Sequence, residues 1–169
     1  MINDLIDFVK MDSGQWREQL KKINFSVFLQ NAVKTLSMDV EVLRHELIYD
    51  IVIPDNIFIS LDEKLVYRAI ENLIHNAVRY TPSGSVIRFI AIPAEKGIEI
   101  IISDNGTGIE KEDLPHVFEM FYRGSSSRRE QGMGLGLAVV KWVVDYHGWS
   151  ISVSSEKGKG ASFTISIPM

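Results

Sequence analysis

Apolar side chains recur three and four positions apart in several stretches of the chain, which is the spacing of one face of an α-helix. The first stretch, residues 1 to about 11, is predicted to be the end of an amphipathic helix. Further helices are predicted from Ser26, as N-cap, to about Arg44, from the cap residue Asp62 to about Tyr80, around Lys111–Val117, and over Gly134–His147. The last is apolar on nearly every side, so we expect it at the centre of the fold.

Runs rich in β-branched residues and bounded by turn residues predict the strands. They cover residues 22–26, 46–53, 57–59, 85–92, 97–103, 150–155 and 162–167. Helices and strands interleave along the chain, and this order predicts an α/β fold. We expect a two-layer sandwich in which three main helices lie against one face of a mixed, mostly antiparallel sheet. The pattern contains no internal repeat and no sign of a second domain.

Composition and charge narrow the functional classes. The chain has 169 residues and no Cys, so cysteine nucleophiles, disulfides and thiolate zinc sites are excluded. The formal net charge of −4 argues against a nucleic-acid partner, so a polyanionic ligand would have to be held by a local group of residues. No apolar run approaches the roughly 18 residues of a membrane-spanning helix, and no signal peptide opens the chain. We therefore expect a cytoplasmic domain without direct membrane contact.

Asn72 and Asn76 lie one turn apart on the predicted helix that ends near Tyr80, in a sector beside its apolar face. Arg79 falls in the same sector. Amide oxygens are suitable ligands for Mg²⁺, which usually shares its coordination shell with water and substrate phosphates. For this helix taken alone, a solvated polar stripe explains the pattern equally well.

Two glycine-containing segments are candidates for binding a nucleotide. Asp104 leaves an apolar strand, and its carboxylate is placed to accept a hydrogen bond from the amine of a purine, while the glycines of Asp104–Gly108 let a flat ligand approach the backbone. Gly132–Leu137 runs into a helix whose N-terminal N–H groups suit a phosphate chain, although its spacing is neither that of a Walker loop nor that of a dinucleotide fold. A strand-ending turn and close helix packing are the alternative interpretations.

Between these segments, Arg123–Gln131 is polar and has no apolar period, so we expect it to be mobile. Residues 121–130 carry three Arg and one Glu, a local charge of +2. Guanidinium groups here would neutralise phosphate oxygens. The alternative is a solvated basic loop held by two core phenylalanines, Phe118 and Phe121.

In this order, the four features resemble the catalytic ATP-binding domain of two-component sensor histidine kinases, from about residue 22 to the end. This domain belongs to the Bergerat-type ATPases, together with gyrase, Hsp90 and MutL. The resemblance implies that ATP and Mg²⁺ bind. It implies that Asn72 and Asn76 bind the metal and phosphates, and that Arg79 and Arg123 bind phosphates. Tyr80 and Asp104 would bind adenine. Gly106 and Gly108 would belong to the first glycine box, Phe118 and Phe121 to the phenylalanine box, and Gly132, Gly134, Gly136 and Leu137 to the second glycine box.

The resemblance also divides the chain. Residues 1–14 resemble the end of a second dimerisation helix with its linker, residues 15–169 form the catalytic domain, and about 118–134 would be the ATP lid. Met133 and Ala161 depart from the family, which often has hydroxyl residues at these positions.

The residue at position 72 helps to distinguish ATP hydrolysis from phosphoryl transfer to another group. Gyrase-like hydrolases have a general base there, whereas Asn72 cannot accept a proton near neutral pH. Glu71 is about 100° away around the helix. We therefore expect transfer of the γ-phosphoryl group to a nucleophile other than water. The resemblance to sensor kinases implies that this nucleophile is a histidine on a separate dimerisation domain, with a response regulator downstream and a membrane-bound sensor as the full-length parent. The segment after His45 lacks the family's acceptor motif. A non-catalytic nucleotide module, an ATP-hydrolysing clamp and an anti-sigma serine kinase remain alternatives.

Overall fold

The computed structural model describes residues 20–124 and 134–169. The helix expected over residues 1 to about 11, and most of the basic Arg123–Gln131 segment, lie outside this range. The elements follow in the order β1 Lys21–Asn24, α2 Phe25–Val42, β2 Glu46–Ile51, β3 Phe58–Leu61, α3 Glu63–Arg79, β4 Val86–Ala94, β5 Gly97–Ser103, the 3₁₀ turn η1 Leu114–His116, α4 Gly136–Tyr146, β6 Ser150–Glu156 and β7 Gly160–Pro168.

Five strands form the main sheet in the order β2-β4-β5-β7-β6. β2 runs parallel to β4, with Leu47 opposite Ile87, and the other neighbouring strands are antiparallel. The sheet is therefore mixed and mostly antiparallel, as predicted. β1 and β3 do not join it, because they pair with each other, with Lys21 opposite Leu61. The sequence pattern predicts these two strands but does not indicate their partners.

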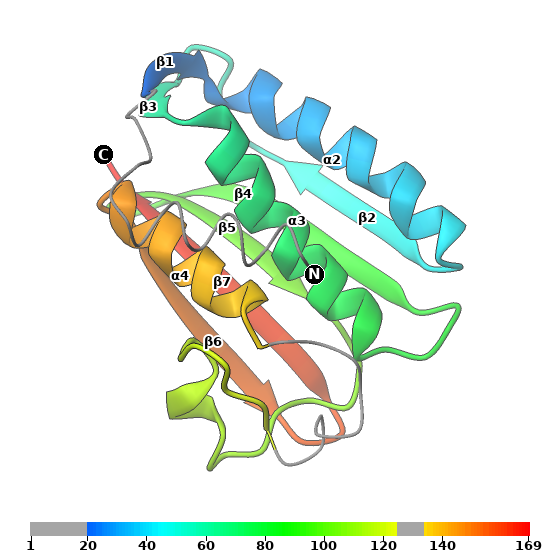
Figure 1. Cartoon of the computed structure of the whole chain (residues 1–169). Coiled ribbons are helices and arrows are strands. Elements are labelled where there is room, and N and C mark those ends of the chain that lie inside the picture. Colours follow the sequence, from blue (N-terminus) through cyan, green and yellow to red (C-terminus); the bar gives the residue numbers. More distant parts are fainter. Residues whose placement is uncertain (1–19, 125–133) are drawn as a thin grey trace.

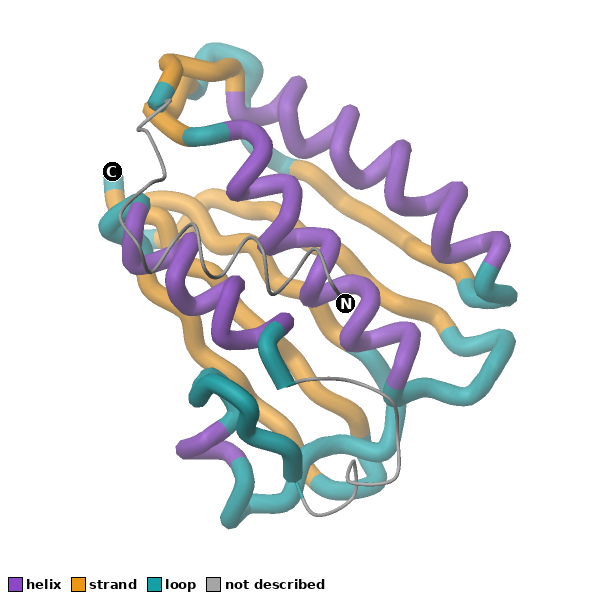
Figure 2. The backbone as a smooth tube through the Cα atoms, viewed as in Figure 1, coloured by secondary structure: helices purple, strands orange, loops and turns teal. Residues whose placement is uncertain are grey.

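The three α-helices of the described residues cover one face of the main sheet, which confirms the predicted two-layer sandwich (Figures 1 and 2). Alternation along the strands sends every second side chain to that face. Phe89, Ile102 and Phe163 lie in line on β4, β5 and β7 and are buried there. Ile70 and Ile74 belong to the buried stripe of α3. None of the helices in the described part of the chain is long and apolar enough to cross a membrane.

The start of α2 differs from the prediction. Asn24, and not Ser26, is the N-cap: its Oδ1 accepts the backbone N–H of Val27 at 3.0 Å. Ser26 lies inside the first turn and is only 1% exposed, and its hydroxyl accepts a hydrogen bond from Gln30. Both residue types are good caps, so their order in the sequence does not distinguish them. Asn24 is also held by a tertiary contact, since its Nδ2 donates to the carbonyl of Asp55 at 2.6 Å.

Two other helices are also shorter than predicted. The helix expected around Lys111–Val117 is only the 3₁₀ turn Leu114–His116. Pro115 lies within this turn and has no N–H to donate, which limits helical hydrogen bonding there. α4 begins at Gly136 and not at Gly134, whose φ of +69° is incompatible with a right-handed helix.

Candidate functional site

Helix α3 carries the two asparagines in the predicted arrangement. It begins where expected, because Asp62 Oδ1 accepts the N–H groups of Lys64 at 3.0 Å and Leu65 at 3.2 Å. Asn72 and Asn76 lie one turn apart beside the buried stripe, and both are partly exposed. The helix therefore holds two amide side chains at the margin of the core.

The start of α4 lies against Asn72. A Cβ on Gly136, the first residue of α4, would be 3.6 Å from Asn72 Oδ1. The Nδ2 atom of Asn72 is buried and has no hydrogen-bond partner among residues 20–124 and 134–169. α3 and α4 pack side by side (Figure 1). The second glycine segment and the asparagine helix, distant in sequence, therefore meet at Asn72.

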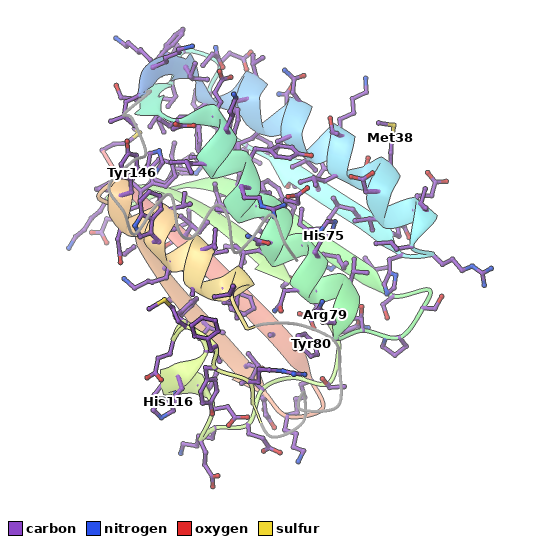
Figure 3. All side chains as sticks on the ribbon, in the orientation of Figure 1. Met38, His75, Arg79, Tyr80, His116 and Tyr146 are labelled. Carbon is purple, nitrogen blue, oxygen red and sulfur yellow. The ribbon has the colours of Figure 1, made fainter. Side chains whose placement is uncertain are left out.

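The loop after β5 is joined to the C-terminal end of α3. The N–H of Thr107 donates to the carbonyl of Tyr80 at 3.1 Å, and Tyr80 N–H donates to the carbonyl of Asn76 at 3.2 Å. A Cβ on Gly106 would lie 2.1 Å from the Tyr80 carbonyl oxygen, so only glycine permits this approach. Arg79 and Tyr80 project from this end of α3 (Figure 3). The Asp104 loop is thus held within one helical turn of Asn76.

Asp104 is held by backbone groups on two sides. Its Oδ1 accepts the N–H of Gly106 at 2.8 Å and that of Ala161 at 3.4 Å, and its own N–H donates to Ala161 O at 2.9 Å. Burial raises the pKa of Asp104, and the two hydrogen bonds from Gly106 and Ala161 oppose this effect. The result is a carboxylate in a partly desolvated position, which strengthens any hydrogen bond it accepts.

The β6–β7 turn, which is not among the predicted site residues, supports the Asp104 loop from the other side. Gly158 N–H donates to Thr107 O at 2.7 Å. A Cβ on Gly160 would lie 2.0 Å from the Asp104 carbonyl oxygen, and one on Gly108 would lie 2.1 Å from the Glu156 carbonyl oxygen. The Gly-x-Gly spacing at 158–160 is the only signal of these close contacts in the sequence.

Phe118 and Phe121, which precede the basic segment, have different environments. The Phe118 ring packs edge-on against Phe163, with ring centroids 6.2 Å apart. Phe121 is 61% exposed and has a φ of +61°, so the interpretation in which both rings belong to the core is wrong for Phe121. The N–H of Phe121 donates to the carbonyl of Gly134 at 3.0 Å. The end of the phenylalanine segment and the approach to α4 are therefore joined.

The remaining predicted residues are placed as follows. Glu71 forms an ion pair with Arg68 on the same helix. Leu137 is partly buried and packs against the hydrophobic core. Arg123 follows Tyr122 and is partly buried. Gly132 lies outside the described residues.

A metal ion in this region would depend on oxygen ligands other than a carboxylate cluster. Over residues 20–124 and 134–169, no group of three or more His, Cys, Asp or Glu side chains is arranged to hold a metal. Asn72 and Asn76 offer two amide oxygens one turn apart on α3, and Mg²⁺ accepts such hard oxygen ligands together with phosphate oxygens and water. The donor set therefore fits a magnesium ion that arrives with a phosphate ligand.

Similar proteins are named as sensor kinases. The chain is 32% identical over 170 residues to the sensor-like histidine kinase SenX3 of Mycobacterium tuberculosis, a match that covers 99% of this chain and 41% of SenX3. It is 32% identical over 177 residues to the sensor histidine kinase WalK of Bacillus subtilis, of which it covers 28%. The chain thus spans less than half the length of these two relatives.

Solved structures show the same fold. Full-length ShkA in complex with AMPPNP superposes with a TM-score of 0.80 at 22% identity, over 99% of this chain and 36% of ShkA. The catalytic domain of histidine kinase ThkA gives a TM-score of 0.75 at 16% identity, over 89% of this chain and 96% of that domain. The family model described as histidine kinase-, DNA gyrase B-, and HSP90-like ATPase matches residues 61–169, and this chain belongs to that family.

Proposed function

We propose that this domain binds Mg-ATP between the C-terminal end of α3, the Asp104 loop and the start of α4, and donates the γ-phosphoryl group to a histidine on a separate dimerisation domain. The observation that carries the proposal is the convergence of these three segments. The Thr107–Tyr80 hydrogen bond joins the first two, and the approach of Gly136 to Asn72 joins α4 to the same helix.

The residues at the two ends of this region suit the two ends of ATP. The partly desolvated Asp104 carboxylate is a strong acceptor for the adenine amine, with Tyr80 beside the loop as an aromatic surface for the ring. At the other end, the buried Nδ2 of Asn72 has no acceptor among the described residues. An unsatisfied buried donor costs about 1–3 kcal/mol, and a phosphate oxygen supplies the missing acceptor.

The metal would be held by the amide oxygens of Asn72 and Asn76 together with phosphate oxygens and water. When bound, Mg²⁺ supplies positive charge to the phosphates during transfer. Arg79 and Arg123 would add guanidinium groups at the same end, and the backbone N–H groups at the start of α4 would face the phosphate chain. Most of the catalytic effect would then come from position and electrostatics, as is usual in phosphoryl transfer.

Transfer to another protein group is favoured over attack by water. An amide stands at position 72, where a general base would be needed, and Glu71 is engaged in an ion pair with Arg68. The relatives are named as sensor histidine kinases and are more than twice as long as this chain. The parent's dimerisation domain, with its acceptor histidine, and a response regulator are therefore the proposed partners. A membrane-bound parent and the assignment of residues 1–14 to the dimerisation helix remain predictions.

Titration with AMPPNP, with and without Mg²⁺, tests the binding site. We expect Asn76→Ala to weaken binding at least tenfold in the presence of Mg²⁺ only, and Asp104→Ala to weaken it in both conditions. Asn31→Ala on the exposed side of α2 is the matched control and should bind like the parent chain. Binding by both site variants that equals the parent's would overturn the residue assignments.

The transfer step is tested by supplying an acceptor domain of the same family in trans with labelled ATP. We expect acid-labile phosphohistidine on the acceptor, and its loss with Asn76→Ala. A chain that binds Mg-ATP tightly but labels no acceptor, whichever dimerisation domain of the named relatives is supplied, would be a nucleotide-binding module and not a kinase.

A further inference from the structure

Asp113 is a buried acidic residue that the predicted site does not include. It is 8% exposed and precedes the 3₁₀ turn η1. Its backbone is held on both sides, since its N–H donates to Glu110 O at 2.9 Å and its carbonyl accepts the N–H of His116 at 2.9 Å. A buried carboxylate is retained only when other groups satisfy it, so the partners of Asp113 are informative.

One partner is the residue before Arg123. The hydroxyl of Tyr122 donates to Asp113 Oδ1 at 2.7 Å, and this hydrogen bond links residues nine positions apart in the sequence. The Tyr122 ring also packs against His116, with centroids 5.3 Å apart. Figure 3 shows His116 in the segment that projects beyond the sheet. Tyr122 is therefore anchored at its hydroxyl and at its ring.

A second contact is made by the residue after Arg123. A Cβ on Gly124 would lie 2.5 Å from Asp113 Oδ2 and 3.2 Å from its Cγ, so the Gly124 backbone passes directly over the carboxylate. The Tyr122 backbone also passes close to Gly134, since a Cβ on Gly134 would lie 2.6 Å from the Tyr122 carbonyl oxygen. The residues on both sides of Arg123 thus contact the same carboxylate, and the main chain of Arg123 spans the two contacts.

We infer that Asp113 is a positioning residue that holds the main chain of Arg123 in place through Tyr122 and Gly124, so that the guanidinium group meets the terminal phosphates of the nucleotide. This inference rests on the proposed function, in which Arg123 contacts phosphate. A main chain fixed before binding loses less conformational entropy when its side chain engages a ligand. Loss of the Asp113 contacts should therefore weaken binding of the phosphate end and spare the adenine end.

The test compares the affinity for Mg-AMPPNP with that for adenosine. Tyr122→Phe removes one hydroxyl, and Asp113→Ala removes both contacts. We expect the affinity for AMPPNP to fall about threefold to tenfold in Tyr122→Phe and at least tenfold in Asp113→Ala, with adenosine affinity unchanged in both. Glu112→Gln, an exposed charge change in the same segment, is the control and should leave both affinities unchanged. Should Asp113→Ala fail to fold, Tyr122→Phe carries the test alone.

A double-mutant cycle separates positioning of Arg123 from a general structural effect. Arg123→Ala alone should weaken AMPPNP binding, and adding Tyr122→Phe to Arg123→Ala should change it no further. An undiminished effect of Tyr122→Phe in that background, or an equal loss of adenosine affinity, overturns the inference. An Arg123→Ala variant that binds AMPPNP like the parent overturns it too. A parent chain that binds no AMPPNP would instead overturn the proposed function.

Discussion

Asp104 combines an unfavourable environment with the role proposed for it. Because burial raises its pKa above the unfolded value of 3.8, the ionised carboxylate lowers the free energy of unfolding at neutral pH. This loss of stability is complete above the folded-state pKa of Asp104. It decreases as the pH falls through that pKa and is absent below the unfolded-state pKa. A residue kept at a cost to stability is consistent with a functional demand for its charge.

Asp104→Asn should therefore stabilise the domain and weaken its ligand binding. The amide keeps an oxygen acceptor for the Gly106 N–H but carries no charge to desolvate. We expect a higher Tm at pH 7, a smaller difference near about pH 4, and an affinity for AMPPNP lower by about tenfold because the hydrogen bond to adenine is no longer charge-assisted. Thermal unfolding at both pH values and a binding titration measure these effects. A lower Tm at pH 7 would show that the carboxylate is a net stabilising group.

Gly106→Ala tests the contact between the Asp104 loop and α3. The added methyl would meet the Tyr80 carbonyl at 2.1 Å, so the loop must move away from the helix. We expect a loss of stability of about 1–3 kcal/mol and at least tenfold weaker AMPPNP binding. Gly84→Ala is the control: its φ of +87° would be strained for alanine, but no atom of the described residues would lie within 4 Å of the added methyl, so the change should cost about 1 kcal/mol without affecting binding. Equal binding losses in the two variants would contradict this account.

At the scale of elements, His147 joins the end of α4 to the start of α3. Its Nε2 accepts the backbone N–H of Asp62 at 3.0 Å, and its Nδ1 donates to Val143 O at 2.7 Å. Since an N–H can only donate and a carbonyl can only accept, this geometry requires the neutral ring. The ring centroids of His147 and Trp149 are 4.8 Å apart, and Asp62 is the acidic group near His147. The two helices that carry the candidate site are thus joined at the ends that lie away from that site, the start of α3 and the end of α4.

This contact predicts a pH-dependent stability. Burial lowers the pKa of His147 below 6.5, although the Val143 carbonyl and the charge of Asp62 oppose the shift. The contribution to stability is therefore complete above about pH 6.5 and is lost as the pH falls through the folded-state pKa, because the unfolded chain binds the proton more readily. His147→Gln should flatten the fall in Tm between pH 7 and pH 5. His75→Gln, an exposed change on α3, is the control. Equal slopes for the parent and His147→Gln would exclude this role.

The elements themselves follow from local signals to different degrees. Asp62 capped α3 as predicted, because the cap and its partners lie within three residues of each other. The start of α2 was predicted wrongly because Asn24 and Ser26 are equivalent as local caps. The pairing of β1 with β3 was not predictable, since strand composition specifies burial and not the partner strand.

At the scale of the whole molecule, the domain carries a candidate nucleotide site but no acceptor motif in its sequence. We expect the isolated chain, incubated with labelled ATP and Mg²⁺, to gain no phosphohistidine on any of its four histidines. On the proposed function, the same preparation should label an acceptor domain added in trans, which serves as the positive control. Acid-labile label on the isolated chain would mean that one of its own histidines, such as His45, is an acceptor.

The sequence alone determined the three main helices, the approximate positions of the strands, the order of the motifs and the residue types at the candidate site. These features depend on hydrophobic periodicity and on hydrogen bonds between residues a few positions apart, which can be read from a short stretch of chain. Only the tertiary structure decided that β1 pairs with β3, that Phe121 is exposed, that Tyr122 and Gly124 meet Asp113, and that His147 binds the backbone of Asp62. The last contact spans 85 residues, and such contacts depend on how the layers pack, because many distant pairs have equivalent local chemistry.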